Sequence, residues 1–580
     1  MMDDAKQKVF DLACRLKENR GEWLTLFEEL ARMYLPNRAG FTGEVSEGDE
    51  RNWDIYTSAP RLARRGLATA LSTMLRPPGR EWFSARAKEE LLNYDEASRA
   101  WLDVATRITY AAIYDPDVDA DRSLSEADDD LVTFGTAVIQ VLWDLSKSKL
   151  QFKTIPLKNA VLLQNAQGKI DGIAYFQDLE LRQVLDLFPE EKLSQSMKDA
   201  LKQGDPKFSQ KFEILHVVIP NDDYQRFGKG PNRLPYKSLW FSVKDKELLD
   251  EGGYYSFPYI VPRWDTMTGE VYGRSPAMVA LADARLANAV SKTMIEAGEK
   301  ALDPPLVAPA DMIRGDVELY AGGLTLYDAN GFQYQGDPIR PVQLGKIPDK
   351  IYEFLGEVER RIYAAFYRDV LELPNTAEKD LTATEINARM DQYLRQAAPV
   401  FSRIESQYNA PLINRVFELL AANSMFPDAP PQLQGQEIKF EYESPVKQAR
   451  EKAKAIKMLE ALQSVLPMVE AKPDIMDNID FDITTRIILQ NFGFPQEAMA
   501  PIEAMAQMRA QRAQQAQMAQ MAQMAQMAGP AMAQSITAAA KAKESGLVPT
   551  DQPFPESMAG LIPPPGQAQG IVDAEFEDAA

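Results

Sequence analysis

A long stretch of helical periodicity at residues 380–422 constrains the fold of this 580-residue chain more than any other feature. Thr382 and Glu385 fit a capping box, in which the threonine hydroxyl binds an early backbone N–H and the glutamate reaches back to the capping residue. Apolar residues recur at helical spacing through the stretch. Pro399 and Pro411 each remove a backbone donor inside it and crowd the preceding turn. The sequence therefore predicts one long, bent helix with a single apolar face.

Two further segments carry informative patterns. The first is LATALSTMLRPPGREWF at 67–83, a short helix stopped by Pro-Pro-Gly and followed by an aromatic pair. The second is DLVTFGTAVIQVLWD at 130–144, followed later by YGRSPAMVALADARLANAVSKTMIEAGEKALDPPLVAP at 272–309. In their order and spacing, these segments and the Thr-Ala-Thr-Glu run at 382–385 resemble the portal, or head-to-tail connecting, proteins of short-tailed, podovirus-type bacteriophages. The resemblance covers residues 5–425 approximately.

The resemblance implies a helix-rich α+β fold with wing, stem, clip and crown parts, assembled as a ring around an axial channel. It divides the chain, together with the local patterns, into the following parts: wing at 1–275, stem helices at 276–301 and 348–370, clip at 302–347, tunnel loop at 371–381, long kinked wing helix at 382–425, wing or crown base at 426–500, Ala/Gln/Met-rich crown or barrel helix at 501–535, and flexible tail at 536–580.

The local patterns predict the elements within the wing and the first stem helix. Amphipathic helices are expected at 3–35, 58–75 and 95–113, and β-type alternation broken by Gly, Pro, Asn and Asp at 136–265 predicts a meandering sheet. Ser275 is expected to cap the first stem helix, with Pro276 at its first position.

Composition limits the classes of protein that the chain can belong to. No window approaches the 18 or so apolar residues of a membrane span, and the first ten residues lack the basic and apolar regions of a signal peptide. The single cysteine, Cys14, excludes an intrachain disulfide and fits synthesis in a reducing host cytoplasm. The expectation is a chain without membrane spans that is made in the host cytoplasm and ends in the virion, at the capsid portal vertex.

The formal net charge of −21 argues against tight nucleic-acid binding, which depends on clustered Lys and Arg. It is compatible with a conduit, because a negative wall repels phosphates and keeps DNA from sticking. Basic residues of the stem and tunnel loop are the candidates for facing DNA in the channel: Arg285, Lys292, Lys300, Lys350, Arg360, Arg361, Arg368 and Lys379. Arg368 and Lys379 flank the expected constriction.

The resemblance also implies partners. It predicts a homo-oligomer of twelve subunits, double-stranded DNA passing through the channel, the terminase large subunit as packaging motor, major capsid and scaffolding proteins, and tail or adaptor proteins. No cofactor is expected. The implied role is a head-to-tail connector for genome packaging and ejection. The alternatives are another oligomeric virion core or scaffold protein, and a carboxylate-metal-dependent enzyme.

The sequence lacks the residues that common enzymatic motifs require. There is no G-x-x-x-x-G-K-[ST], and a single histidine, His216, leaves no basis for a zinc site or a hydrolase triad. His216 lies in the strand-like run EILHVVIP and is expected to be a core residue. No catalytic residue is therefore assigned, and the chain is not expected to be an enzyme.

One acidic segment matches EF-hand spacing. The residues at the ligand positions are Asp115, Asp117, Asp119, Asp121 and Glu126. Ala120 replaces the glycine that the loop needs for its sharp turn, so a solvated acidic loop is the competing interpretation. The run at 128–130, three aspartates, is interpreted as a charged helix start, not as a two-metal site.

Overall fold

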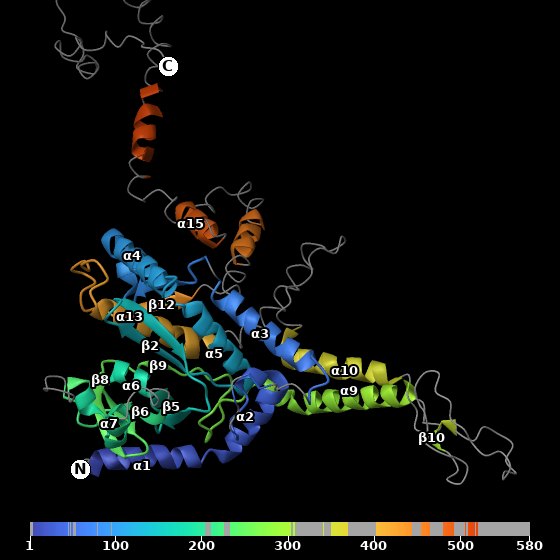
Figure 1. The fold of residues 1–580 in the computed structure, drawn as a ribbon. Coiled ribbons are helices and arrows are strands. Elements are labelled where there is room, and N and C mark those ends of the chain that lie inside the picture. Colours follow the sequence, from blue (N-terminus) through green and yellow to red (C-terminus); the bar gives the residue numbers. More distant parts are fainter. Residues whose placement is uncertain are drawn as a thin grey trace, which may run out of the picture. The chain divides into compact units, whose positions relative to one another are not determined.

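The computed structural model describes part of the chain (Figure 1), namely residues 4–43, 46, 48–49, 54–77, 79–93, 95–202, 210–225, 233–302, 306–307, 340–341, 350–368, 402–442, 454–464, 480–491, 505, 508–516 and 518–519. Met1–Glu470 form one compact unit and Ala471–Ala580 a second. The predicted tunnel loop, most of the predicted clip and crown helix, the tail, and the long helix before residue 402 lie outside the described residues.

The N-terminal region forms two helices, α1 (Asp4–Glu18) and α2 (Gly21–Tyr34), so the prediction of one helix over 3–35 is wrong. The chain breaks at Arg20, whose buried guanidinium donates to the carbonyls of Leu157 and Ala160 at 2.9 and 2.6 Å. The same guanidinium also donates to the carbonyl of Lys158, so one arginine fork supplies donors to three carbonyls of residues 157–160 at the point where α1 and α2 separate. Amphipathic periodicity alone does not reveal this tertiary demand.

The next helices confirm the predicted positions. The helix α3 (Ala59–Leu75) has Pro60 at its second position, and α4 (Glu96–Ile113) is capped by Asp95, whose carboxylate accepts from Ser98 N at 2.9 Å. The helix α5 (Ala120–Phe134) starts well before the three aspartates at 128–130, so their interpretation as a helix start is wrong. It ends at Gly135, in the left-handed conformation.

The predicted meander at 136–265 is confirmed, but it divides into two antiparallel sheets with strand orders β3-β2-β9 and β4-β5-β6-β7-β8. The strands are β2 (Ile139–Asp144), β3 (Lys149–Thr154), β4 (Ala160–Gln164), β5 (Ile170–Glu180), β6 (Lys211–Pro220), β7 (Tyr236–Ser242), β8 (Glu247–Tyr254) and β9 (Tyr259–Ile260). Two short helices, α6 (Leu181–Leu187) and α7 (Gln195–Lys202), lie between β5 and β6 in the sequence. The helix α1 packs on the larger sheet through Phe10, 5.5 Å from Phe241 between ring centroids.

A third pairing joins segments that are far apart in the sequence. The strand β1 (Phe83–Ala87) pairs antiparallel with β12 (Ile438–Tyr442), and α4 lies against β1. The largest hydrophobic core combines α2, α3, α5, the smaller sheet and the helix α13 (Ala410–Ala422). This core makes α5 the central helix of the unit, which explains why its polar residues need buried partners.

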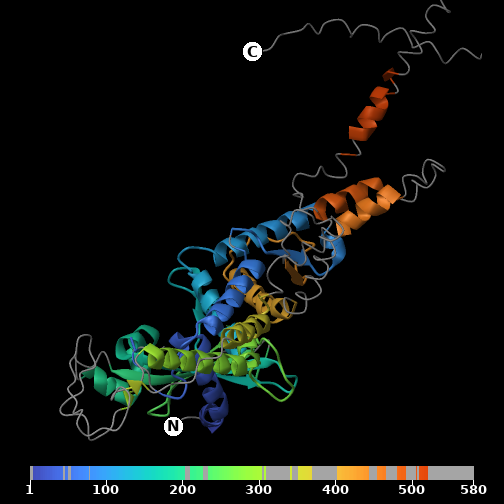
Figure 2. The ribbon, with the colours of Figure 1, turned by 90° about the vertical axis from the view of Figure 1, so that its right-hand side faces the viewer.

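A helical hairpin leaves this core (Figures 1 and 2). It consists of α8 (Pro276–Val279), α9 (Leu281–Leu302) and α10 (Lys350–Ala365), with α9 and α10 side by side. The predicted cap is confirmed, because Ser275 Oγ accepts from Met278 N at 3.0 Å. The helix α10 ends five residues before the predicted 370, and Tyr367 follows with a left-handed φ of 57°. Between α9 and α10 in the sequence, a two-residue pairing joins β10 (Leu306–Val307) and β11 (Arg340–Pro341).

The described part of the predicted long helix is helical from residue 402 to 422, with one irregularity. Residues Glu405–Asn409 form a π-helical turn, closed by Ala410 N–H donating to Glu405 O, directly before Pro411. A proline removes the N–H that would bond to the carbonyl four residues earlier and its ring crowds that carbonyl, here Gln407 O. The wider π turn relieves this crowding.

In the second unit, α15 (Phe481–Asn491) and residues 508–516 are helical. Among the described residues of the whole chain, no helix is both long enough and apolar enough to cross a lipid bilayer.

Candidate functional site

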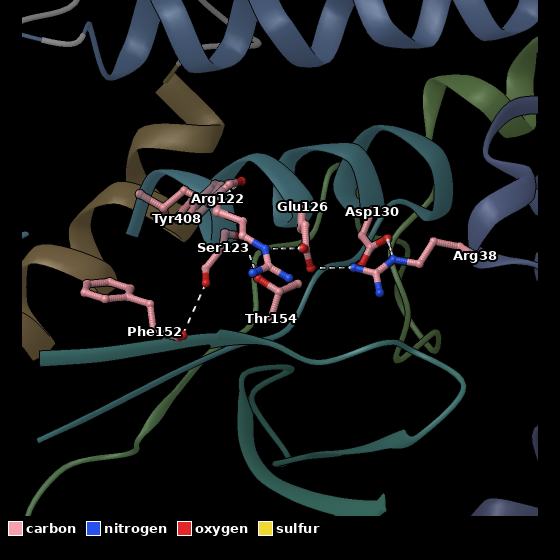
Figure 3. Close-up of polar contacts among 9 residues, drawn as sticks. Arg38, Arg122, Ser123, Glu126, Asp130, Phe152, Thr154 and Tyr408 are labelled. Atoms are coloured by element: carbon pink, nitrogen blue, oxygen red, sulfur yellow. Dashed lines mark hydrogen bonds and ion pairs between the residues drawn. The ribbon is translucent and has the colours of Figure 1, made fainter. Parts of the chain in front are cut away.

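Three consecutive aspartates of α5 each meet an arginine from a different part of the chain. Asp128 pairs with Arg76, which follows α3, and both side chains are 2% exposed. Asp129 pairs with Arg64 of α3. Asp130 accepts from Arg38 Nε at 3.2 Å, and Arg38 also contacts Glu126 at 3.2 Å (Figure 3). We call these three aspartates and their arginines the α5 charge cluster.

Burial dominates the electrostatics of this cluster. It raises the pKa of Asp130 to about 7, because desolvation of the carboxylate outweighs the attraction of Arg38. Burial likewise raises the pKa of Asp128, although Arg76 opposes it. Burial alone would lower the pKa of Arg76, but the Asp128 carboxylate raises it. Asp128 Oδ1 and Asp130 Oδ2 have no hydrogen-bond partner among the described residues, so the cluster is incompletely satisfied.

Hydrogen bonds extend from α5 to its other neighbours. Ser123 Oγ donates to Phe152 O at 3.2 Å and Thr154 Oγ1 donates to Ser123 O at 2.5 Å, which fixes α5 on β3 (Figure 3). From the π turn, Tyr408 donates to Leu124 O at 3.4 Å. The helix α5 therefore ties together α3, the smaller sheet and the segment before α13.

The sequence analysis missed the α5 charge cluster. Its interpretation of 128–130 as a charged helix start overlooked that Asp128 and Asp130, two positions apart, are both buried. The available signal was Arg64 of α3, which lies among the apolar residues Ala63, Leu67 and Ala68. An arginine on an apolar helix face needs a charged partner.

The EF-hand candidates do not converge on one point. Asp115 and Asp117 contact Lys149 at 3.0 and 2.7 Å. Asp119 lies 3.6 Å from Arg122, and Glu126 contacts Arg122 and Arg38. Asp121 lies exposed in the first turn of α5. The described residues contain no group of three His, Cys, Asp or Glu side chains that could hold a metal ion.

His216 is a fully buried residue of β6, as the sequence predicts. Its ring stacks on Trp240 at 3.8 Å between centroids. Gln140 donates to Tyr259 OH at 3.1 Å, so that hydroxyl is left to donate to His216 Nδ1 at 2.8 Å, and Nε2 faces Ser238 Oγ at 2.9 Å. This chain of bonds suits a neutral imidazole, and burial lowers the pKa of His216 to about 3.

Acid should therefore destabilise the fold through His216. His216 binds a proton below about pH 6.5 in the unfolded chain but only below about pH 3 in the folded chain. The free energy of unfolding therefore falls as the pH is lowered from about 6.5 to about 3. Between about pH 7.5 and about pH 5, the wild-type chain should lose about 2 kcal/mol more of its free energy of unfolding than His216→Gln, because the variant has no imidazole to protonate. Urea unfolding at both pH values measures it. A difference independent of pH would contradict the assignment.

The hairpin carries six of the eight basic residues that the sequence analysis selected for the channel, and Arg368 follows α10. Arg285 pairs with Glu29 of α2, and Arg361 lies 3.6 Å from Asp283, which shows that α9 and α10 run antiparallel. Lys292 lies 3.8 Å from Glu296, one turn along α9.

The remaining candidates lie toward the ends of the two helices. Lys300 and Lys350 are exposed near the tip of the hairpin. Arg360 Nε donates to Gly356 O at 3.3 Å, and the Arg368 guanidinium lies 4.7 Å from the centroid of the Tyr363 ring. Lys379 lies outside the described residues.

The base of the hairpin is anchored to the core. Asn288 of α9 donates to Asp54 O at 3.0 Å and accepts from Tyr56 N at 2.7 Å. Phe366, after α10, packs on Tyr34 of α2 at 5.5 Å between centroids. A hairpin that is anchored at one end and exposed along its outer faces can present its charges to a neighbour or to a channel.

Comparisons with known proteins identify the family of the chain. The chain is 26% identical over 501 residues to "Probable portal protein" of Bordetella phage BPP-1, covering 85% of this chain and 89% of that protein. It is 25% identical over 518 residues to "Portal protein" of Salmonella phage epsilon15, covering 88% and 91%. The family described as bacteriophage head to tail connecting protein matches residues 6–500. The chain therefore belongs to the family of bacteriophage head to tail connecting proteins.

Proposed function

We propose that twelve copies of the chain form a closed ring at one capsid vertex, with an axial channel through which double-stranded DNA enters and leaves. The observation that carries this proposal is the family match over residues 6–500, which includes the core, the hairpin and the segment before α13. A closed ring repeats one heterologous interface between neighbours, so every surface contact recurs around the axis.

In this arrangement the antiparallel pair α9 and α10 is the stem that lines the channel. The core with its two sheets is the wing, residues 302–347 the clip, and residues 501–535 the crown or barrel. The charges of α9 and α10 support the stem assignment. The chain has a net charge of −21, whereas each of these helices carries as many basic as acidic residues. A wall with little net charge neither binds nor strongly repels phosphates.

The proposed role is conduction without chemistry. A terminase large subunit docked at the clip would drive DNA through the ring, and tail or adaptor proteins would replace it after packaging. Major capsid and scaffolding proteins would contact the wing during assembly at the vertex. These partners are proposed from membership of the family.

A double substitution tests the DNA-facing assignment. Arg368→Ala with Lys379→Ala removes two positive charges at the proposed constriction, where each charge could retain DNA by contact with a phosphate. Rings should form as in wild type, but the amount of DNA retained per procapsid should fall severalfold in a packaging assay.

The matched control removes two positive charges elsewhere. Lys192 and Lys202 lie in or next to α6 and α7, exposed and paired with Asp250 and Asp199, away from the hairpin. Their double alanine variant should package normally. Normal packaging by the Arg368→Ala, Lys379→Ala variant would remove these residues from the channel.

A further inference from the structure

The π turn at Glu405–Asn409 is the one irregular turn in the described part of the helix at 402–422. The chain after it is firmly held, because Arg415 of α13 is buried and donates to Val141 O at 3.3 Å and to Ser256 Oγ at 2.6 Å. The chain before it is held at the surface. Arg403 contacts Asp265 at 2.9 Å, and these side chains are 43% and 58% exposed.

The turn itself contacts the α5 charge cluster. Arg76 Nη1 donates to Asn409 Oδ1 at 3.3 Å, while its other terminal nitrogen pairs with Asp128. The Tyr408 ring lies over the same guanidinium, 4.5 Å from its centroid to Arg76 Cζ. Both Tyr408 and Asn409 are fully buried. Arg76 therefore holds the last two residues of the π turn.

This packing leaves a complementary pair of polar atoms unused. Asn409 Nδ2 is a donor and Asp128 Oδ1 an acceptor; both side chains contact Arg76, and both atoms lack a partner among the described residues. A buried polar atom without a partner costs stability. The two unpaired atoms therefore lower the stability of the observed π form, which depends on the bond from Arg76 to Asn409.

We propose that Glu405–Asn409 is a two-state hinge, held in its π form by Arg76 and Asp128, and that release of Asn409 lets the turn close into an α-helical form. One residue fewer per turn changes the helical phase by about 100°. Residues 402–404 then rotate by that amount relative to α13, and the surface contacts of Arg403 and Gln407 break. Pro411 and the Arg76 contact favour the π form, whereas regular backbone hydrogen bonding favours the α form.

The hinge links the core to the segment that precedes it in the sequence. Arg76 follows α3, which contacts α10 of the hairpin, and Asp128 belongs to α5. A shift of α3 would therefore move the Arg76 guanidinium and change its contacts with the hinge. Its consequence for DNA passage rests on the proposed function, but the hinge itself does not.

Distances between two spin labels test the hinge in the assembled full-length chain. The labels are placed at Ser402→Cys and Asn414→Cys, both exposed, in a Cys14→Ser background diluted with unlabelled chains. A rotation of about 100° should change their separation by about 5 Å or more. Asn409→Ala removes the hydrogen bond from the charged Arg76 guanidinium. The population with the second distance, that of the α form, should then rise about tenfold relative to the population with the first distance, that of the π form.

A second variant acts on the turn from its other side. Pro411 is exposed, and Pro411→Ala restores the N–H that can bond to Gln407 O, so it should also populate the second distance. Asn423→Ala, at the end of α13, and Pro60→Ala, at the start of α3, are the matched controls and should keep the wild-type distance.

The outcomes separate the hinge from the proposed function. A wild-type distance distribution in folded Asn409→Ala overturns the hinge. If Asn409→Ala does not fold, the exposed Pro411→Ala decides, and an unchanged distribution there overturns it equally. Rings that show the second distance but carry no DNA would leave the hinge standing and count against the conduit.

Discussion

Substitution of Gly135 by alanine should unfold the chain or abolish its soluble production. Gly135 ends α5 with a φ of +76°, and a Cβ there would lie 2.5 Å from Gly273 O, a backbone atom that cannot rotate away. The reverse approach is equally close, because a Cβ on Gly273 would meet Gly135 O. Left-handed backbone and backbone clash together should cost on the order of 4 kcal/mol.

Thermal unfolding followed by circular dichroism, with the soluble yield, measures this effect. Gly66→Ala, inside α3 with open space around its Cβ, is the matched control. It should be neutral or stabilising by roughly 1 kcal/mol, because alanine favours helix. Equal melting temperatures for Gly135→Ala and Gly66→Ala would contradict the close approach of the Gly135 and Gly273 backbones.

Loss of the Arg76 side chain should be nearly as severe. Arg76→Ala leaves the Asp128 carboxylate buried without its counter-charge and removes the contacts to Asn409 and Tyr408. Breaking a buried ion pair from one side costs about 3–5 kcal/mol. Arg122→Ala is the control, since that side chain is 72% exposed and its ion pairs should contribute less than about 1 kcal/mol.

A double substitution separates charge from packing in this pair. Arg76→Met with Asp128→Leu removes both charges and keeps apolar volume, so most of the lost stability should return. Urea unfolding of wild type, Arg76→Ala, Arg122→Ala and the double variant compares their free energies of unfolding. A double variant as unstable as Arg76→Ala would show that the pair matters for shape more than for charge balance.

Local sequence patterns predicted much of the fold. Helical periodicity at 58–75 and 95–113 predicted α3 and α4, and Ser275 before α8 is a chemical signal that a helix begins; the structure confirms all three. The alternation at 136–265 likewise predicted strands. These features depend on residues close together in the sequence, and so the sequence shows them.

The missed features depend on distant partners. At the break between α1 and α2, Arg20 donates to carbonyls near residue 160. The strand β1 pairs with a strand more than 350 residues later. The division of the meander into two sheets is also set by tertiary packing. For the candidate site, the burial of Asp128 and Asp130 follows from the arginines of other elements, which a charged run on its own does not reveal.

The hinge illustrates both cases. Pro411 predicted an irregular helix, and the π turn directly before it confirms that interpretation. Nothing near Asn409 in the sequence indicates that Arg76, more than 300 residues earlier, contacts its side chain. The kind of irregularity could be predicted from local chemistry, but the contact that holds it could not.

Imaging of the chain produced together with its capsid and scaffolding proteins tests the central claim most directly. The account predicts a closed ring with an axial channel at one vertex, and a purified assembly of twelve 65.0 kDa chains, about 780 kDa by light scattering. Chains spread over all vertices, or recovered only as 65.0 kDa monomers from such capsids, would contradict it.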